Sequence, residues 1–158
     1  MPRIFLSSIA VFSLFLSFSG CATVPPASPE FEKKARSFTP PPDRAAVYVC
    51  RPASIVGFAV IYVVSLDYAD FGTLANETYL FGLVLPGEHT VKAGGGIPLH
   101  VDMIKFTADP GKNYFFSAGP GWAGISLELL SEDRGRRMVG ELKQSGDNIF
   151  EFYDNSKK

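Results

Sequence analysis

Apolar and polar side chains alternate in short runs along most of the chain after residue 44, and turn residues separate the runs. β-branched and aromatic residues, which favour strands, are concentrated in these runs. Runs of this kind lie at 45–51, 58–66, 70–74, 79–85, 89–93, 98–107, 114–118 and 125–130. Pro86-Gly87 and Asp109-Pro110-Gly111 provide tight reversals between them. The pattern predicts a mostly β protein, an antiparallel β-sandwich of about seven to eight strands.

One helix is predicted near the C-terminus. Residues 136–144 place Met138 and Leu142 at helical spacing, and Ser145-Gly146 ends the pattern. The sandwich domain is therefore expected to span 45–146. The tail, residues 147–158, contains an apolar stretch that either adds an edge strand or docks on the sheet.

The N-terminus has the pattern of a secretory signal. Arg3 precedes a run of fifteen residues, 4–18, that is apolar except for serines and is short for a membrane span. The run ends in Phe18-Ser19-Gly20-Cys21, which resembles the lipobox of bacterial lipoproteins, although a leucine is usual where Phe18 stands. We expect residues 1–20 to be a signal peptide, cleaved between Gly20 and Cys21, and Cys21 to carry the lipid, palmitate included.

Two alternatives to a lipid anchor are a transmembrane anchor and an ordinary cleaved signal with an incidental cysteine. The basic residues Lys33, Lys34 and Arg36 follow the apolar run at too great a distance to form a tight stop-transfer boundary. By resemblance to enterobacterial lipoproteins, Ala22 in place of aspartate implies sorting to the outer membrane, with the protein facing the periplasm.

A proline-rich segment follows the expected lipidation site. Residues 22–44 contain six prolines, mixed charge and no sustained apolar period. Such segments favour extended polyproline geometry at about 3.1 Å per residue, which gives a reach of roughly 70 Å. We expect residues 21–44 to be a tether that holds the domain away from the membrane.

Composition limits the number of domains and the class of partner. Removal of residues 1–20 leaves 138 residues, enough for one domain, with a net charge of about −2 and no block of like charge. Nucleic acid is therefore not expected as a partner. With Cys21 lipidated, Cys50 has no cysteine to pair with inside the chain. Its alternating neighbours predict a buried thiol, and the alternative is an exposed thiol that pairs with a second chain.

Four segments, taken in order, resemble a family of uncharacterised bacterial lipoproteins that share a domain of unknown function, number twenty-eight forty-six. They are PPPDRAAVYVCRPASIVGFAV, LPGEHTVKA, DPGKNYFF and LELLSEDRGRRMVGELK, between Pro40 and Lys143. Where the family has a glycine-bearing turn this chain has Asp67-Tyr68-Ala69-Asp70, so that hairpin is expected to differ. The LPGEHTVKA hairpin is also similar to β-domains of the PEGA and carboxypeptidase-regulatory type. These are binding or spacer modules, which implies neither catalysis nor a cofactor.

Histidines are the residues to test for metal binding or acid–base chemistry, and the chain has two. His100 and Asp102 would share one face of a strand, where they could bind a metal or tune a base. Two ligands do not make a metal site, and we interpret His89 as an exposed hairpin residue. We therefore expect no enzyme and no metal. The alternative is a small hydrolase or metal-dependent enzyme that uses His100 and Asp102.

Trp122, the sole tryptophan, lies between glycines in a loop. It either projects into solvent and anchors a partner or caps the open end of the sandwich. Phe58 would join it if the two loops meet at one end. The sequence thus predicts a non-enzymatic, membrane-anchored envelope module whose partner, a protein or a polymer, contacts Trp122 and Phe58.

Overall fold

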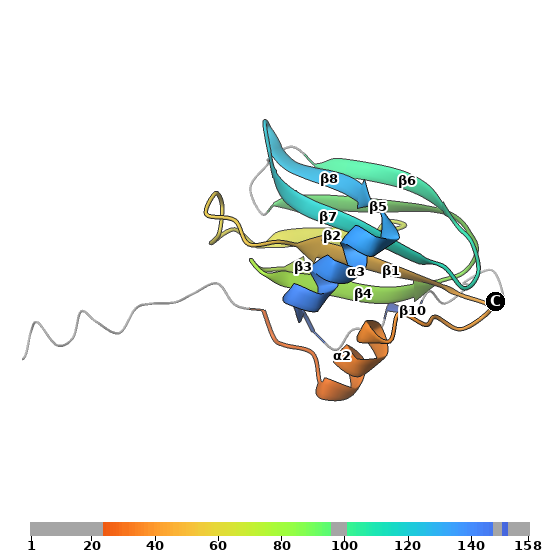
Figure 1. Cartoon of the computed structure of the whole chain (residues 1–158). Coiled ribbons are helices and arrows are strands. Elements are labelled where there is room, and N and C mark those ends of the chain that lie inside the picture. The colour runs from red at the N-terminus through yellow and green to blue at the C-terminus, as the bar shows by residue number, and fades with distance from the viewer. Residues whose placement is uncertain (1–23, 96–100, 147–149, 152–158) are drawn as a thin grey trace, which may run out of the picture.

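The described residues fold as a β-sandwich with two helices on one outer face (Figure 1). The computed structural model describes residues 24–95, 101–146 and 150–151. In chain order the elements are α2 (Pro29–Arg36), β1 (Ala45–Arg51), β2 (Tyr62–Leu66), β3 (Ala69–Leu74), β4 (Thr78–Val84), β5 (Gly87–Gly95), β6 (Asp102–Ala108), β7 (Asn113–Gly121), β8 (Gly124–Leu130), α3 (Glu132–Glu141), β9 (Lys143–Gln144) and β10 (Phe150–Glu151). The predicted mostly β sandwich is confirmed.

Two sheets form the sandwich. One has the strand order β10-β4-β1-β7-β8, with β9 also paired to β4, and the other has the order β3-β2-β5-β6. Most neighbouring strands are antiparallel, but β1 runs parallel to β7, and β9 and β10 run parallel to β4. The tail was expected either to add an edge strand or to dock on the sheet. Its described residues, 150–151, form the edge strand β10.

Both faces of β1 are buried, because a second hydrophobic layer covers the outside of its sheet. Ala45, Val47 and Val49 face the core between the two sheets. Ala46, Tyr48 and Cys50 face the opposite way, into a second core under the two helices. A strand covered on both sides is expected to be apolar at every position, and the run AAVYVC fits this.

Helix α3 packs closely on this second core through a glycine. An ideal Cβ on Gly135 would lie 2.1 Å from Cγ of Phe115, so the helix backbone rests directly on that ring. Val139 and Leu142 fill the same core. The helix begins four residues before the predicted start, because the charged first turn, Glu132 and Asp133, has no apolar periodicity that would reveal it.

The prediction that residues 22–44 form an extended tether is wrong for the described part. Residues 29–36 form α2, with Pro29 and acidic residues in the first turn and basic residues in the last, which suits the helix dipole. Ala35 is fully buried, and its carbonyl accepts a hydrogen bond from Tyr48 Oη at 2.7 Å. This segment is therefore part of the folded domain.

Arg36 joins the two helices. Its guanidinium donates to the carbonyls of Val139, Gly140 and Leu142 at 3.0, 3.3 and 2.7 Å. These carbonyls lie at the C-terminal end of α3, where helical carbonyls lack partners within the helix. Glu32 holds the same guanidinium at 2.8 Å. The N-terminal segment thus stabilises an element more than 100 residues further along the chain.

Cys50 is fully buried in the second core, as predicted. Burial raises the pKa of its thiol to about 12, so the thiol stays protonated near neutral pH. The alternative of an exposed thiol that pairs with another chain is wrong.

Candidate functional site

The loop between β1 and β2, residues 52–61, exposes three large apolar side chains. Ile55 is 92% exposed, Val56 68% and Phe58 64%. The sequence predicted a strand from residue 58, but β2 begins only at Tyr62. The apolar residues before Tyr62 therefore belong to a surface loop.

Arg51, at the end of β1, binds the buried side of this loop. Its side chain is 1% exposed and donates to the carbonyls of Gly57 (2.7 Å), Leu74 (3.0 Å) and Val60. The guanidinium also lies 3.8 Å from the centre of the Tyr62 ring. Burial lowers the pKa of Arg51, and Tyr62 opposes that shift. The loop backbone is thus bound to a buried cation while its apolar side chains point outward.

Two polar contacts further fix the loop. Asn76, in the β3–β4 turn, accepts the backbone N–H of Ser54 at 3.0 Å, and the Ser54 hydroxyl donates to the Val56 carbonyl at 3.0 Å. Ile55 and Val56 lie within the segment that these contacts hold. Their exposure is therefore built into the fold.

Trp122 forms the tip of the β7–β8 hairpin and is fully exposed. The pairing of β1 with β7 stops at Ser117, but β7 continues to Gly121, so the hairpin extends about 13 Å beyond the last pair. The alternative that Trp122 caps the open end of the sandwich is wrong. It projects into solvent.

The two loops lie at the same end of the sandwich. Because β1 and β7 are parallel neighbours, the loop that follows β1 and the hairpin that follows β7 emerge on the same side. Figure 1 shows both at the left of the molecule. Phe58 and Trp122 are thus both exposed at this end. We call the exposed side chains of Ile55, Val56, Phe58 and Trp122 the apolar tip.

The described N-terminal segment starts at this same end. Pro26 bridges to Ser145, and Pro25 accepts the N–H of Gly146 at 2.8 Å. With Val24, these prolines line a depression of about 700 Å³ beside the β3–β4 turn, at the start of β4. The chain thus enters the domain beside the apolar tip.

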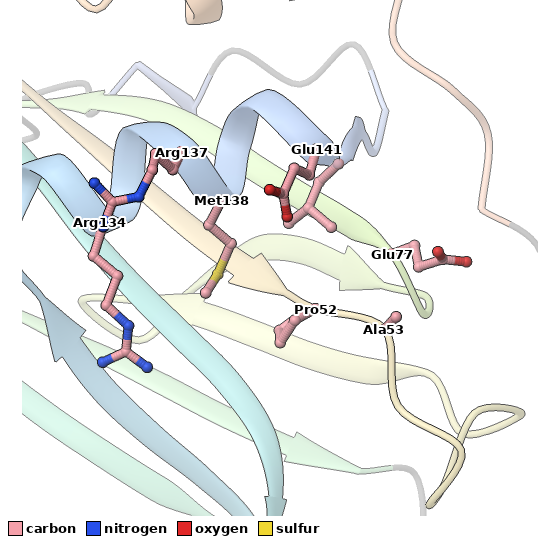
Figure 2. A pocket seen from close by; sticks show the side chains of 8 residues that line it. Pro52, Ala53, Glu77, Arg134, Arg137, Met138 and Glu141 are labelled. Atoms are coloured by element: carbon pink, nitrogen blue, oxygen red, sulfur yellow. The ribbon is translucent and has the colours of Figure 1, made fainter.

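A smaller groove, about 280 Å³, lies between α3 and the start of the β1–β2 loop (Figure 2). Its lining residues are Pro52, Ala53, Glu77, Arg134, Arg137, Met138, Glu141 and Leu142. Arg134 also pairs with Glu128 at 2.6 Å. The two arginines and two glutamates balance in charge, and the lining contains no serine, cysteine or histidine. The lining thus offers charged and apolar groups, but no hydroxyl, thiol or imidazole.

His89 is buried, which corrects the interpretation of an exposed hairpin residue. Its Nδ1 lies 2.5 Å from Asp67 Oδ2, and its Nε2 lies 2.7 Å from the Leu85 carbonyl. The other oxygen of Asp67 accepts the N–H of Thr90 at 2.8 Å. Asp67 and Tyr68 have positive φ, and the contacts of Asp67 with His89 and Thr90 fix the β2–β3 turn in which they lie. Sequence reasoning missed the burial of His89 because Asp67, the residue that pairs with it, is 22 residues away.

His100 lies outside the described residues, so its distance from Asp102 is not defined. Asp102 accepts the N–H groups of Leu127 and Met103 at 2.8 and 2.9 Å, and so links β6 to β8. Among residues 24–95, 101–146 and 150–151, no group of three or more potential metal ligands comes together.

The predicted lipidation site, Gly20 and Cys21, also lies outside the described residues. Within the described ranges, neither helix has the length and apolar character needed to cross a bilayer.

No family model matches the chain, and no solved structure matches it. The chain is similar to an uncharacterized protein of Haemophilus influenzae, with 28% identity over 141 residues that cover 86% of this chain and 82% of that protein.

Proposed function

We propose that this protein is a lipoprotein of the bacterial cell envelope, anchored through lipid on Cys21, whose β-sandwich is a non-enzymatic binding module. The N-terminal signal pattern supports the anchor. So does the resemblance of residues 40–143 to uncharacterised bacterial lipoproteins. Ala22 supports placement in the outer membrane, facing the periplasm.

The apolar tip is the observation that carries the binding role. Soluble domains place large apolar side chains at loop tips at a cost in hydration, so a cluster of them indicates a contact surface. Buried polar contacts of Arg51 and Asn76 hold the loop in this arrangement. Trp122 and Phe58 remain the predicted partner contacts, and Ile55 and Val56 join them.

Labelling with a palmitate analogue in the native host tests the anchor. We expect the wild-type protein to incorporate the label and the Cys21→Ser variant to lose it. Cys50→Ser is the matched control and keeps the label, because Cys50 is buried in the folded domain. On a density gradient, the labelled protein is expected with the outer membrane. Label on the Cys21→Ser variant, or none on the wild type, would contradict the proposal.

A further inference from the structure

We propose that the apolar tip is a membrane-contacting surface and that its partner is the lipid bilayer that holds the anchor. The inference rests on the proposed lipidation of Cys21. It deepens that function by naming what the exposed side chains contact: the acyl and headgroup boundary of a bilayer.

The first support is the length of chain between the anchor and the domain. Cys21 is three residues before Val24, and three residues span at most about 10 Å when fully extended. Val24 already lines the same depression as the β3–β4 turn. Because α2 is docked on the domain, the linker is short and does not have the expected reach of roughly 70 Å. The end of the sandwich where the chain enters must therefore face the membrane.

The second support is the position of the exposed apolar residues. In the described chain, the five most exposed large hydrophobic side chains are Ile55, Val56, Phe58, Tyr68 and Trp122. Four of them form the apolar tip, beside the point of entry. Tyr68 lies in the β2–β3 turn at the opposite end. The apolar surface is thus concentrated on the side that the anchor turns toward the bilayer.

The third support is the chemistry of the two segments. The loop, residues 52–61, and the hairpin tip, residues 121–124, contain no charged side chain. Aliphatic side chains enter the acyl boundary, and tryptophan is favoured at the interface between headgroups and acyl chains. Because apolar insertion rather than charge drives this contact, we expect it on zwitterionic lipid and at high salt.

Trp122 provides the test, because it is the sole tryptophan. The mature lipidated protein is reconstituted into phosphatidylcholine vesicles with or without brominated acyl chains. We expect brominated lipid to quench the tryptophan emission and aqueous iodide to have little access. The Ile55→Ser/Phe58→Ser variant is expected to lose most of this quenching.

Tyr68→Asn is the matched control, since it removes an aromatic side chain that is 78% exposed at the opposite end, and asparagine tolerates the positive φ there. It should leave the quenching unchanged. Emission that brominated lipid does not quench and iodide does would overturn the inference, and would show the apolar tip free for a protein or polymer instead.

The mass of the N-terminal peptide, measured on the same sample, separates the two proposals. An acylated Cys21 with an unquenched Trp122 overturns only the membrane contact. A protein without acyl chains overturns the lipid anchor, whatever the tryptophan shows.

Discussion

Replacing Gly135 by alanine is expected to lower the free energy of unfolding by about 1 to 3 kcal/mol, although alanine is the better helix former. The added methyl group would lie 2.1 Å from Phe115 Cγ and 2.4 Å from its Cβ, so α3 must move away from the sheet. That movement would pull Val139 out of the second core and the α3 carbonyls away from Arg36. Urea unfolding followed by circular dichroism measures the change.

Gly140 provides a matched control in the same helix. A Cβ there meets nothing within 4 Å, so Gly140→Ala is expected to raise stability by about 0.5 to 1 kcal/mol. If Gly135→Ala does not fold, the substitution is made in a Phe115→Ala background, which removes the nearest atom, Cγ, and there it should cost less stability than in the wild type. Equal stability of the two alanine variants would show that α3 does not rest on Phe115.

Replacing Arg51 by methionine is expected to lower the free energy of unfolding by about 2 to 4 kcal/mol and to release the loop that carries the apolar tip. Methionine keeps the apolar volume but removes every donor to the carbonyls of Gly57, Val60 and Leu74. Urea unfolding measures the stability. Amide hydrogen exchange, measured peptide by peptide, shows whether residues 52–61 lose protection.

Arg51→Lys separates the charge of Arg51 from its geometry. A lysine ammonium is a point charge and cannot reach three carbonyls with a planar fork, so we expect a smaller loss of stability and partial protection of the loop. The account of Arg51 would be wrong if residues 52–61 exchanged at the same rate in the methionine variant and in the wild type.

The strands could be predicted because their signal is local. In β1 the bounds 45–51 follow from an apolar run, residues 45–50, which Asp43 and Arg44 precede and Arg51 ends. Turn residues such as Pro86-Gly87 and Asp109-Pro110-Gly111 mark the limits of several other strands. Cys50 was correctly expected to be buried, although the alternation from which this was predicted does not exist, because both faces of β1 are buried.

Contacts between distant parts of the chain could not be predicted. Residues 29–36 form a helix that stays in place because Ala35 meets Tyr48 and Arg36 meets the end of α3. The proline content of this segment, which suggested a tether, does not indicate that it would contact Tyr48 or α3. Arg51 gave no signal either, since an arginine at a strand end usually reaches solvent, whereas here the β1–β2 loop folds over it.

The candidate site was predicted in part. Trp122 and Phe58 were singled out as residues in glycine-bearing loops, and the parallel pairing of β1 with β7 brings those loops to one end. Ile55 and Val56 were missed because they precede the run 58–66, which was the segment assigned to a strand. Only the contacts of Arg51 and Asn76 reveal that the whole segment is a fixed surface loop.

The mass of the mature N-terminal peptide tests the central claim most directly, because the orientation of the sandwich depends on where the chain is anchored. Protein purified from the envelope of its host is digested, and its first peptide is sequenced by tandem mass spectrometry. We expect a peptide that begins at Cys21 and carries a thioether-linked diacylglycerol and an amide-linked acyl chain. A mature chain that retains residues 1–20, or one that carries an unmodified Cys21, would contradict the account.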